Sequence, residues 1–328
     1  MTLRRRKFLT LLGSAAAGWP IAARAQQAAM PVVGFLNNDS PAAVADGLRA
    51  FHEGLREAGY VEGDNVAILY RFSEAHTDRL PALAADLVRR RVAVLASWGT
   101  APGLAAKAAT TTIPLGFSVS DDPVKLGLAA SLARPGSNAT GYSLLSAELT
   151  AKRLGLLREM VPRAAKVAAI LDPVLPQTDT TLRELEAAAS AMGLKLQILK
   201  ASTSGEINAA FAALAQERPD ALFVPSGALF EARRVQLVNL ASRHAIPASY
   251  SGREFVEAGG LMSYGPKLVE SFRQVGAYTG RILKGDKPGD LPVVQPSKFK
   301  FVINAQSAGL IGIEVPPALL AIADEVIE

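Results

Sequence analysis

Short apolar segments alternate with amphipathic segments along almost the whole chain, and this alternation constrains the fold more than any other feature. In the first half, apolar runs at 31–36, 66–70, 92–96 and 113–117 predict strands. The segment after the first run carries Val44, Leu48, Phe51 and Leu55 on one helical stripe, and 80–88 shows the same spacing. Continuous apolar strands separated by amphipathic helices indicate an α/β fold with a parallel sheet covered on both faces.

A second series of the same kind follows. Strands are predicted at 166–171, 195–199, 221–224 and 246–249, with helices around 178–192, 205–217, 229–243 and 252–258. The remaining part departs from this pattern, with a strand at 260–264, a helix at 267–284 and strand-like pieces at 291–294 and 298–303. We therefore expect the chain to pass between two bodies more than once, near 139–146, 260–266 and 294–300.

Chain length supports the same division. The roughly 300 residues after the first 25 exceed one ordinary hydrophobic core, so two lobes are expected. We predict two doubly wound parallel-sheet lobes. Lobe I comprises 26–142 plus about 265–293, and lobe II comprises 143–264 plus about 294–328.

The first 25 residues read as an export signal. Arg4, Arg5, Arg6 and Lys7 precede an apolar run at 8–23, and a small-x-small site at 23–25 predicts cleavage near Ala25. The run is too short for a comfortable membrane span, which needs roughly 20 apolar residues. An arginine pair before an apolar pair fits the twin-arginine type, and an ordinary secretory signal is the alternative.

Charge and cysteine content exclude several classes of function. Five of the 35 basic residues lie in the predicted signal, which has no acid, so 30 basic residues remain against 30 acidic ones. This balance gives no support to nucleic-acid binding. The chain has no cysteine, which excludes disulfides, thiolate metal sites and a lipid anchor after cleavage. An exported protein without an anchor is expected in a periplasm.

Polar residues gather just after the predicted strands. Ligands of open parallel α/β sheets bind beyond the carboxyl ends of the strands, so these residues are candidates for a cleft between the lobes. They are Asn37 to Ser40, Ser97 to Thr100, Ser118, Ser120 to Asp122, Asp172, Ser226, Gly227, Tyr250, Ser251 and Glu254. Capping a helix or shaping a turn is the alternative role for each of them.

This set suits a small zwitterion or carboxylate. Gly99 and Thr100 open an Ala-rich helix, whose N-terminus could hold an anion. An acid among Asp121, Asp122 and Glu254 could hold an ammonium group. Trp98 and Tyr250 could stack on a flat ligand, or pack within the lobes instead.

Enzyme signatures are missing from the sequence. No nucleophile elbow, phosphate-binding loop or dinucleotide fingerprint occurs. The three histidines, His52, His76 and His244, lack partners at metal-binding spacing, so neither a metal site nor a cofactor is expected. We therefore predict a binding protein with no catalytic residues.

Six sequence blocks together resemble one family. They are PVVGFLNN at 31–38, REAGYVEG at 56–63, LPALAADLV at 80–88, DPVKLG at 122–127, RPGSNATG at 134–141 and GGLMSYG at 259–265. In this order they resemble the ABC-transporter substrate-binding proteins of the tryptophan/tyrosine type, which have a type I periplasmic-binding fold. The resemblance extends from the signal to about residue 325.

The resemblance implies two lobes joined by three crossover strands, with a small ligand clamped between them. It also implies delivery of an amino-acid-like ligand, aromatic in members with known ligands, to an inner-membrane ABC permease with its ATPase. We expect the protein to be a monomer. On matching loops the resemblance marks cleft residues: Asn37, Ser40, Gly99, Thr100, Asp121, Ser143, Asp172, Ser226 and Glu254. Alternatives are a periplasmic receptor for a signalling partner and an exported enzyme.

Overall fold

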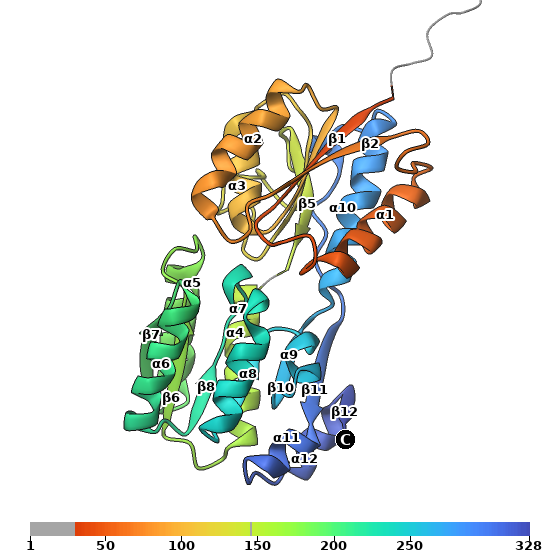
Figure 1. The fold of residues 1–328 in the computed structure, drawn as a ribbon. Coiled ribbons are helices and arrows are strands. Elements are labelled where there is room, and N and C mark those ends of the chain that lie inside the picture. The colour runs from red at the N-terminus through yellow and green to blue at the C-terminus, as the bar shows by residue number, and fades with distance from the viewer. Residues whose placement is uncertain (1–29, 145) are drawn as a thin grey trace, which may run out of the picture.

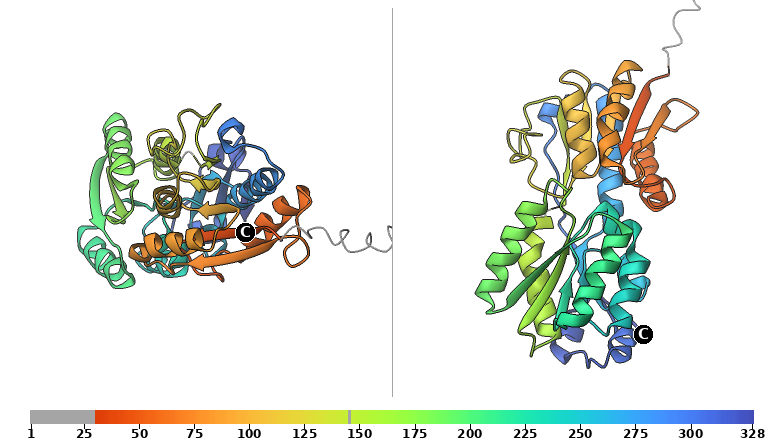
Figure 2. Two further views of the ribbon diagram at one scale, coloured as in Figure 1. Left: turned by 90° about the horizontal axis from the view of Figure 1, so that it is seen from above. Right: turned by 60° about the vertical axis from the view of Figure 1, so that its left-hand side comes forward.

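The computed structural model describes residues 30–144 and 146–328, and these form two α/β lobes (Figure 1). In the side view of Figure 2, lobe I lies above lobe II and the C-terminus is at the far end of lobe II. The predicted export signal, 1–25, falls outside the described residues. Within the described ranges, no helix has both the length and the apolar character needed to cross a membrane.

Lobe I contains a five-stranded, entirely parallel sheet in the order β2-β1-β3-β4-β5. Its strands are β1 (Val32–Asn37), β2 (Ala67–Phe72), β3 (Val94–Trp98), β4 (Leu115–Val119) and β5 (Ala139–Ser143). Helices α2 (Leu80–Arg89) and α3 (Thr100–Ala109) pack on one face, and α1 (Ala45–Glu57) and α10 (Leu268–Leu283) pack on the other. The short 3₁₀ helices η1 (Thr77–Arg79) and η2 (Pro288–Asp290) belong to the same lobe.

Lobe II contains a seven-stranded sheet in the order β12-β11-β10-β9-β8-β6-β7. Its strands are β6 (Lys166–Leu171), β7 (Lys195–Lys200), β8 (Ala221–Phe223), β9 (Ala248–Tyr250), β10 (Met262–Pro266), β11 (Phe299–Asn304) and β12 (Glu325–Ile327). The pair β10–β11 is antiparallel and the other pairs are parallel.

Helices cover both faces of the second sheet. Side chains of α4 (Ser146–Met160), α5 (Thr178–Ala191), α11 (Ala305–Leu310) and α12 (Pro317–Ile322) form one core cluster. Side chains of α6 (Ser204–Glu217), α7 (Ala228–Ala232), α8 (Arg234–Arg243) and α9 (Arg253–Glu257) form the other. The predicted fold class, two α/β lobes with helices on both faces of mostly parallel sheets, is thus confirmed.

Three connections join the lobes: the passage from β5 to α4, the passage from β10 to α10, and the segment between Val294 and β11. Val294 lies against β5, where its N–H donates to the Gly141 carbonyl at 2.9 Å and its carbonyl accepts from the Ser143 N–H at 2.9 Å. The strand-like piece predicted at 291–294 is therefore only an isolated bridge to Tyr142, because its pairing ends there.

Some elements escaped prediction. Strand β5, helices α4, α11 and α12, and strand β12 were not expected, and the helix expected at 229–243 is divided into α7 and α8. Helix α4 has a weak apolar stripe, with intervening polar residues such as Lys152 and Arg153. Its buried leucines, Leu154, Leu156 and Leu157, lie too close together in sequence to produce a clear periodic signal.

Helix α10 returns from lobe II to pack closely on α1 (Figure 1). Two glycines allow this approach. A Cβ at Gly54 would overlap the Arg273 carbonyl oxygen, and one at Gly276 would overlap the Phe51 carbonyl oxygen. Helix α10 thereby completes the face of lobe I that α1 alone leaves open, although more than 200 residues separate the two helices in sequence.

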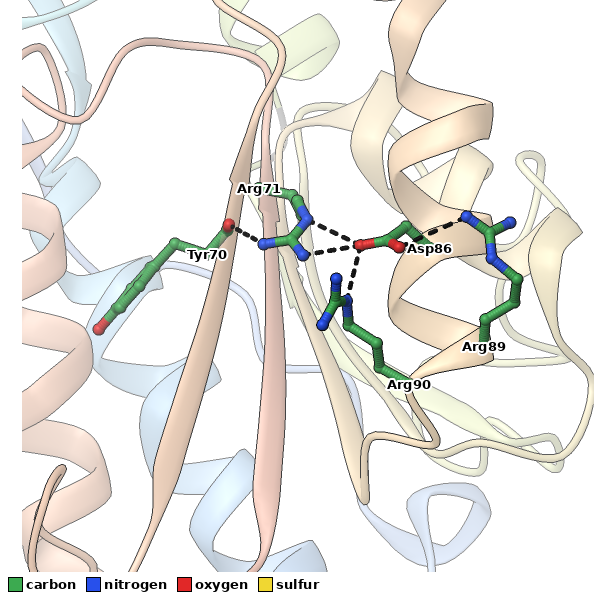
Figure 3. A network of polar contacts seen from close by, with 5 residues as sticks. All are labelled: Tyr70, Arg71, Asp86, Arg89 and Arg90. Carbon is green, nitrogen blue, oxygen red and sulfur yellow. Dashed lines mark hydrogen bonds and ion pairs between the residues drawn. The ribbon is translucent and has the colours of Figure 1, made fainter.

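On the opposite face, one carboxylate ties α2 to the edge strand β2 (Figure 3). Arg71 donates from Nε and Nη2 to Asp86 Oδ2 at 3.0 and 2.7 Å, and Arg90 Nε donates to the same oxygen at 3.0 Å. Arg71 Nη1 also donates to the Tyr70 carbonyl at 2.8 Å, and Arg89 approaches Asp86 Oδ1 at 3.4 Å. These arginines hold the pKa of the Asp86 carboxyl below its usual value.

Candidate functional site

The candidate site is a cavity between the two lobes, with about 880 Å³ of empty space including its open mouth. Lobe I contributes the ends of β1, β3 and β4 and the first turn of α3. Lobe II contributes α4, α7, the loops after β6, β8 and β9, and residues of β10. The lining residues are Asn38, Asp39, Trp98, Gly99, Thr100, Ala101, Pro102, Ser120, Leu144, Leu149, Arg153, Leu175, Gln177, Ser226, Gly227, Ala228, Glu231, Ser251, Tyr264, Pro266 and Leu268.

The wall from lobe I is aromatic and rigid. Trp98, at the end of β3, donates from Nε1 to the Ser271 hydroxyl at 2.8 Å and stacks on Phe272. Gly99 follows with φ 106°, a left-handed conformation that favours glycine. The Thr100 hydroxyl accepts a hydrogen bond from the Ser120 N–H at 3.1 Å, and this bond joins the start of α3 to the loop after β4 within lobe I.

Lobe I also contributes a buried acid. Asp39 is only 6% exposed, and its Oδ1 has no hydrogen-bond partner among the described residues. Its backbone N–H donates to the Asn37 side chain at 2.7 Å, which fixes the loop after β1. Burial raises the pKa of the Asp39 carboxyl to about 6, because a carboxylate removed from water is less stable than the neutral acid.

The wall from lobe II contains a buried cation. Arg153, on α4, is 4% exposed, and its Nη2 donates to the carbonyls of Val224 at 2.5 Å and Ser249 at 3.3 Å. Its guanidinium lies 4.3 Å from the centre of the Phe223 ring. Its Nε has no partner, and no described carboxylate lies within ion-pair distance of it. Burial lowers the pKa of Arg153, and a guanidinium so held still stays charged at neutral pH.

A second acid faces the cavity from lobe II. Glu231, on α7, accepts a hydrogen bond from the Ser251 hydroxyl at 3.0 Å. Burial raises the pKa of Glu231 to about 8, and the negative charges of Glu254 and Asp39 add to this rise. The hydrogen bond from Ser251 and the charge of Arg234 oppose it. The two acids that line the cavity therefore influence each other although they belong to different lobes.

Of the nine residues that the family resemblance marks and the two aromatic residues expected to stack on a ligand, four line this cavity: Trp98, Gly99 and Thr100 from lobe I and Ser226 from lobe II. These four residues follow two different strands. The expectation that ligands bind beyond the carboxyl ends of strands is therefore correct for part of the site. The other seven predicted residues lie outside the lining, and the structure assigns them local roles.

Three of those seven stabilise loops of lobe I. The Asn37 side chain accepts from the Asp39 N–H, and the Ser40 hydroxyl accepts from the Ala43 N–H at 3.4 Å. The Ser143 hydroxyl donates to the Asp121 carbonyl at 3.1 Å. Asp121 itself is buried, with a pKa raised by burial to about 6, and it does not line the cavity.

The remaining three belong to lobe II. Asp172 accepts from the Val174 N–H at 3.0 Å in the loop after β6. Tyr250 is buried in the core, stacked on Phe255 with ring centroids 4.8 Å apart, and so it cannot stack on a ligand in this cavity. Glu254 lies at the start of α9, where it acts on Glu231 through its charge.

Sequence reasoning selected none of Arg153, Glu231, Tyr264 and Gln177. Asn38, Asp39 and Ser251, which also line the cavity, were among the candidates predicted beyond the strand ends. Arg153 does not follow any predicted strand, because its helix begins after a crossing between the lobes. Among the described residues, no group of three or more His, Cys, Asp or Glu side chains could hold a metal ion.

Comparison with known proteins gives consistent matches. The model of a family described as ABC transporter substrate binding protein matches residues 29–327. A curated tyrosine-binding protein of Clostridioides difficile (strain R20291) is 27% identical over 257 residues, which cover 78% of this chain and 73% of the relative.

Two solved structures extend these matches to the fold. A conserved domain protein from Vibrio cholerae has a TM-score of 0.84 at 26% identity, covering 90% of this chain and 99% of the other. An ABC domain in complex with L-Trp from Streptococcus pneumonia has a TM-score of 0.83 at 25% identity, with the same coverage.

Proposed function

The chain belongs to the ABC transporter substrate-binding protein family, and from this premise we propose that it captures a small aromatic amino acid outside the cytoplasm and delivers it to an inner-membrane permease with its ATPase. One observation carries the proposal. A single cavity, lined by both lobes, combines aromatic walls with a buried cation, a buried acid and a second, half-buried acid.

Each part of an aromatic amino acid has a complementary group in this cavity. Trp98 and Tyr264 offer ring surfaces for a flat side chain. Arg153 offers positive charge for a carboxylate, and Asp39 and Glu231 offer oxygens for an ammonium group. Leu149, Leu175 and Leu268 supply apolar contacts around them. Small-molecule sites typically combine such apolar walls with a few well-placed polar groups.

The relatives support the class of ligand. One is named for binding tyrosine and another was solved with L-Trp. Both ligands are zwitterions with an aromatic side chain, which matches the chemistry of the cavity described above.

Transport requires that the ligand change the lobe arrangement. A ligand that contacts both walls binds the closed arrangement better than an open one, and it therefore shifts the population toward closure. In this proposal, the permease recognises the closed form. One chain contains both walls of the cavity and so suffices for binding, and in this proposal the protein acts as a monomer.

Trp98 makes the binding test direct. After removal of the predicted signal, Trp98 is the only tryptophan in the chain, so its fluorescence reports on the cavity alone. We expect L-tyrosine and L-phenylalanine to change this fluorescence with saturation at one ligand per chain, and L-tryptophan to bind in calorimetry. An absence of binding across these three amino acids would contradict the proposed ligand class.

Export and delivery need separate tests. Edman sequencing of protein from a periplasmic fraction should begin at Gln26, and replacing Arg5 and Arg6 by lysine should block export if the signal is of the twin-arginine type. Deletion of the gene should lower uptake of the bound amino acid. Normal uptake in the deletion strain, with binding intact, would exclude the delivery role.

A further inference from the structure

Two acids face one cavity from different lobes without a basic partner. Asp39 lies on the loop after β1 in lobe I, and Glu231 lies on α7 in lobe II. No described lysine, arginine or histidine forms an ion pair with either carboxyl. Asp39 is more than nine-tenths buried, and its Oδ1 has no hydrogen-bond partner among the described residues. A buried carboxylate oxygen without a partner is costly, so its position at a cavity wall points to a ligand group.

The charges around this pair do not neutralise it. Glu254 on α9 adds negative charge near Glu231, and the opposing effect of Arg234 on α8 is the smaller of the two. Arg234 directs its Nη1 to the Glu231 backbone carbonyl at 3.1 Å instead of to the carboxyl. Arg153 on α4 directs its Nη2 to the carbonyls of Val224 and Ser249, and its charge attracts that of Glu231 without a direct ion pair. The described surroundings therefore leave both carboxyl groups without a direct cationic partner, a place that a cation would fill.

We propose that the ammonium group of the ligand binds between Asp39 and Glu231 and joins the two lobes, so that only a ligand with a positive charge holds them closed. This inference rests on the proposed function, since it assigns one end of the proposed amino acid to named residues. The amino group donates to Asp39 Oδ1 and to Glu231, while Ser251 keeps its hydrogen bond to Glu231. Charge-assisted hydrogen bonds of this kind are stronger than neutral ones.

Proton release accompanies such binding. Without ligand, Glu231 has a pKa of about 8 and so holds a proton at pH 7. An ammonium group favours the carboxylate, so the proton leaves Glu231 for the solvent when the ligand binds. The affinity then rises with pH, by up to about tenfold per unit below pH 8, and levels off above it.

The first experiment compares L-tryptophan with indole-3-propionate, which lacks the amino group but keeps the ring and carboxylate. Calorimetry is carried out on the mature chain in phosphate and in Tris at pH 7, because the two buffers differ in ionisation enthalpy and reveal released protons. We expect L-tryptophan to bind at least about tenfold more tightly and to release close to one proton.

Two variants assign the effect to the residues. Asp39→Asn and Glu231→Gln should each lower the affinity for L-tryptophan by about tenfold to a hundredfold, which is the effect expected for loss of a hydrogen bond to a charged group. Both should leave indole-3-propionate nearly unchanged, and Glu231→Gln should abolish proton release. Asp46→Asn and Glu217→Gln make the same chemical changes at exposed positions of the two lobes and should bind like the parent protein.

The outcomes separate the two proposals. Equal affinity for L-tryptophan and indole-3-propionate, or unchanged preference in both variants, would overturn the ammonium site and leave the proposed function standing. Failure of L-tryptophan, L-tyrosine and L-phenylalanine to bind at all would overturn the proposed ligand class, and the ammonium site with it.

Discussion

The indole of Trp98 stacks on the ring of Phe272, with ring centroids 4.3 Å apart and an angle of 21° between the planes. Its Nε1–H donates to the hydroxyl of Ser271, the residue before Phe272, at 2.8 Å. The residue that forms the aromatic wall of the cavity is thus fixed by α10, which enters lobe I only after the chain has formed most of lobe II. A wall held in this way loses little freedom when a ligand binds.

Substitution of Trp98 should show whether this wall contacts the ligand. Trp98→Ala should lower the affinity for L-phenylalanine by about tenfold or more, because it removes a ring contact worth ~1.5 kcal/mol. Ser271→Ala keeps the ring and removes only its hydrogen bond, so it should weaken binding less. Calorimetry measures both, and equal losses in the two variants would mean that orientation of the ring, not its surface, dominates.

Arg153 should stabilise lobe II as well as bind ligand. Arg153→Met removes the donor to the Val224 and Ser249 carbonyls, and we expect the free energy of unfolding in urea to fall by about 2 kcal/mol. The same variant should lose its preference for L-tryptophan over tryptamine, which lacks the carboxylate. A destabilised variant that retains this preference would limit Arg153 to a structural role.

Glu231 should make stability depend on pH. Its pKa is raised from 4.5 to about 8 in the folded chain, so folding favours the protonated form. This contribution is complete below pH 4.5 and is lost as the pH rises to about 8. Glu231→Gln cannot ionise, so its Tm should match the parent below pH 4.5 and exceed it increasingly toward pH 8.

The exposed Glu217→Gln variant is the control for this measurement, and its difference from the parent should stay small across the range. A Tm of Glu231→Gln that is lower than the parent at every pH would show that the carboxylate stabilises the fold.

The Asp86 network should stabilise lobe I mainly above acidic pH. The pKa of this carboxyl lies below its usual 3.8, with the hydrogen bonds from Arg71 as the largest cause. Its contribution is present above pH 3.8 and is lost as the pH falls through the lower, folded value. Asp86→Asn should therefore lower the Tm at pH 7, and the difference should shrink in acid. Asp46→Asn, at an exposed pair with Arg49, should change the Tm little at either pH.

The close approach of α1 and α10 should tolerate no added methyl group. Gly54→Ala places a Cβ against the Arg273 carbonyl, and we expect it to lower the free energy of unfolding by about 1–3 kcal/mol. Gly155→Ala, in the middle of α4, meets only the Met192 methyl at 3.6 Å and should raise stability by roughly 0.5–1 kcal/mol. Urea unfolding of the two variants compares them directly.

Prediction succeeded where the signal was local. The strand pattern, the stripe of Val44, Phe51 and Leu55, and the six family blocks all lie in continuous segments, and the fold class and the family resemblance are confirmed. Trp98 to Thr100 were found because they directly follow a predicted strand, whose carboxyl end must face the ligand side of the sheet. The export signal and the lobe boundaries stay predictions.

Prediction failed where a role depended on distant partners. Tyr250 follows a strand just as Trp98 does, but its ring turns into the core against Phe255. Arg153 and Glu231 gave no local signal, because the groups with which they interact lie far away in the chain: the Val224 and Ser249 carbonyls for Arg153, and Asp39 for Glu231. Hydrophobic periodicity reports which face of a segment avoids water, so the residue order alone specified two layered α/β bodies. Which charges share one cavity depended on how those bodies meet, since burial and Coulomb interaction act through space between residues far apart in the chain.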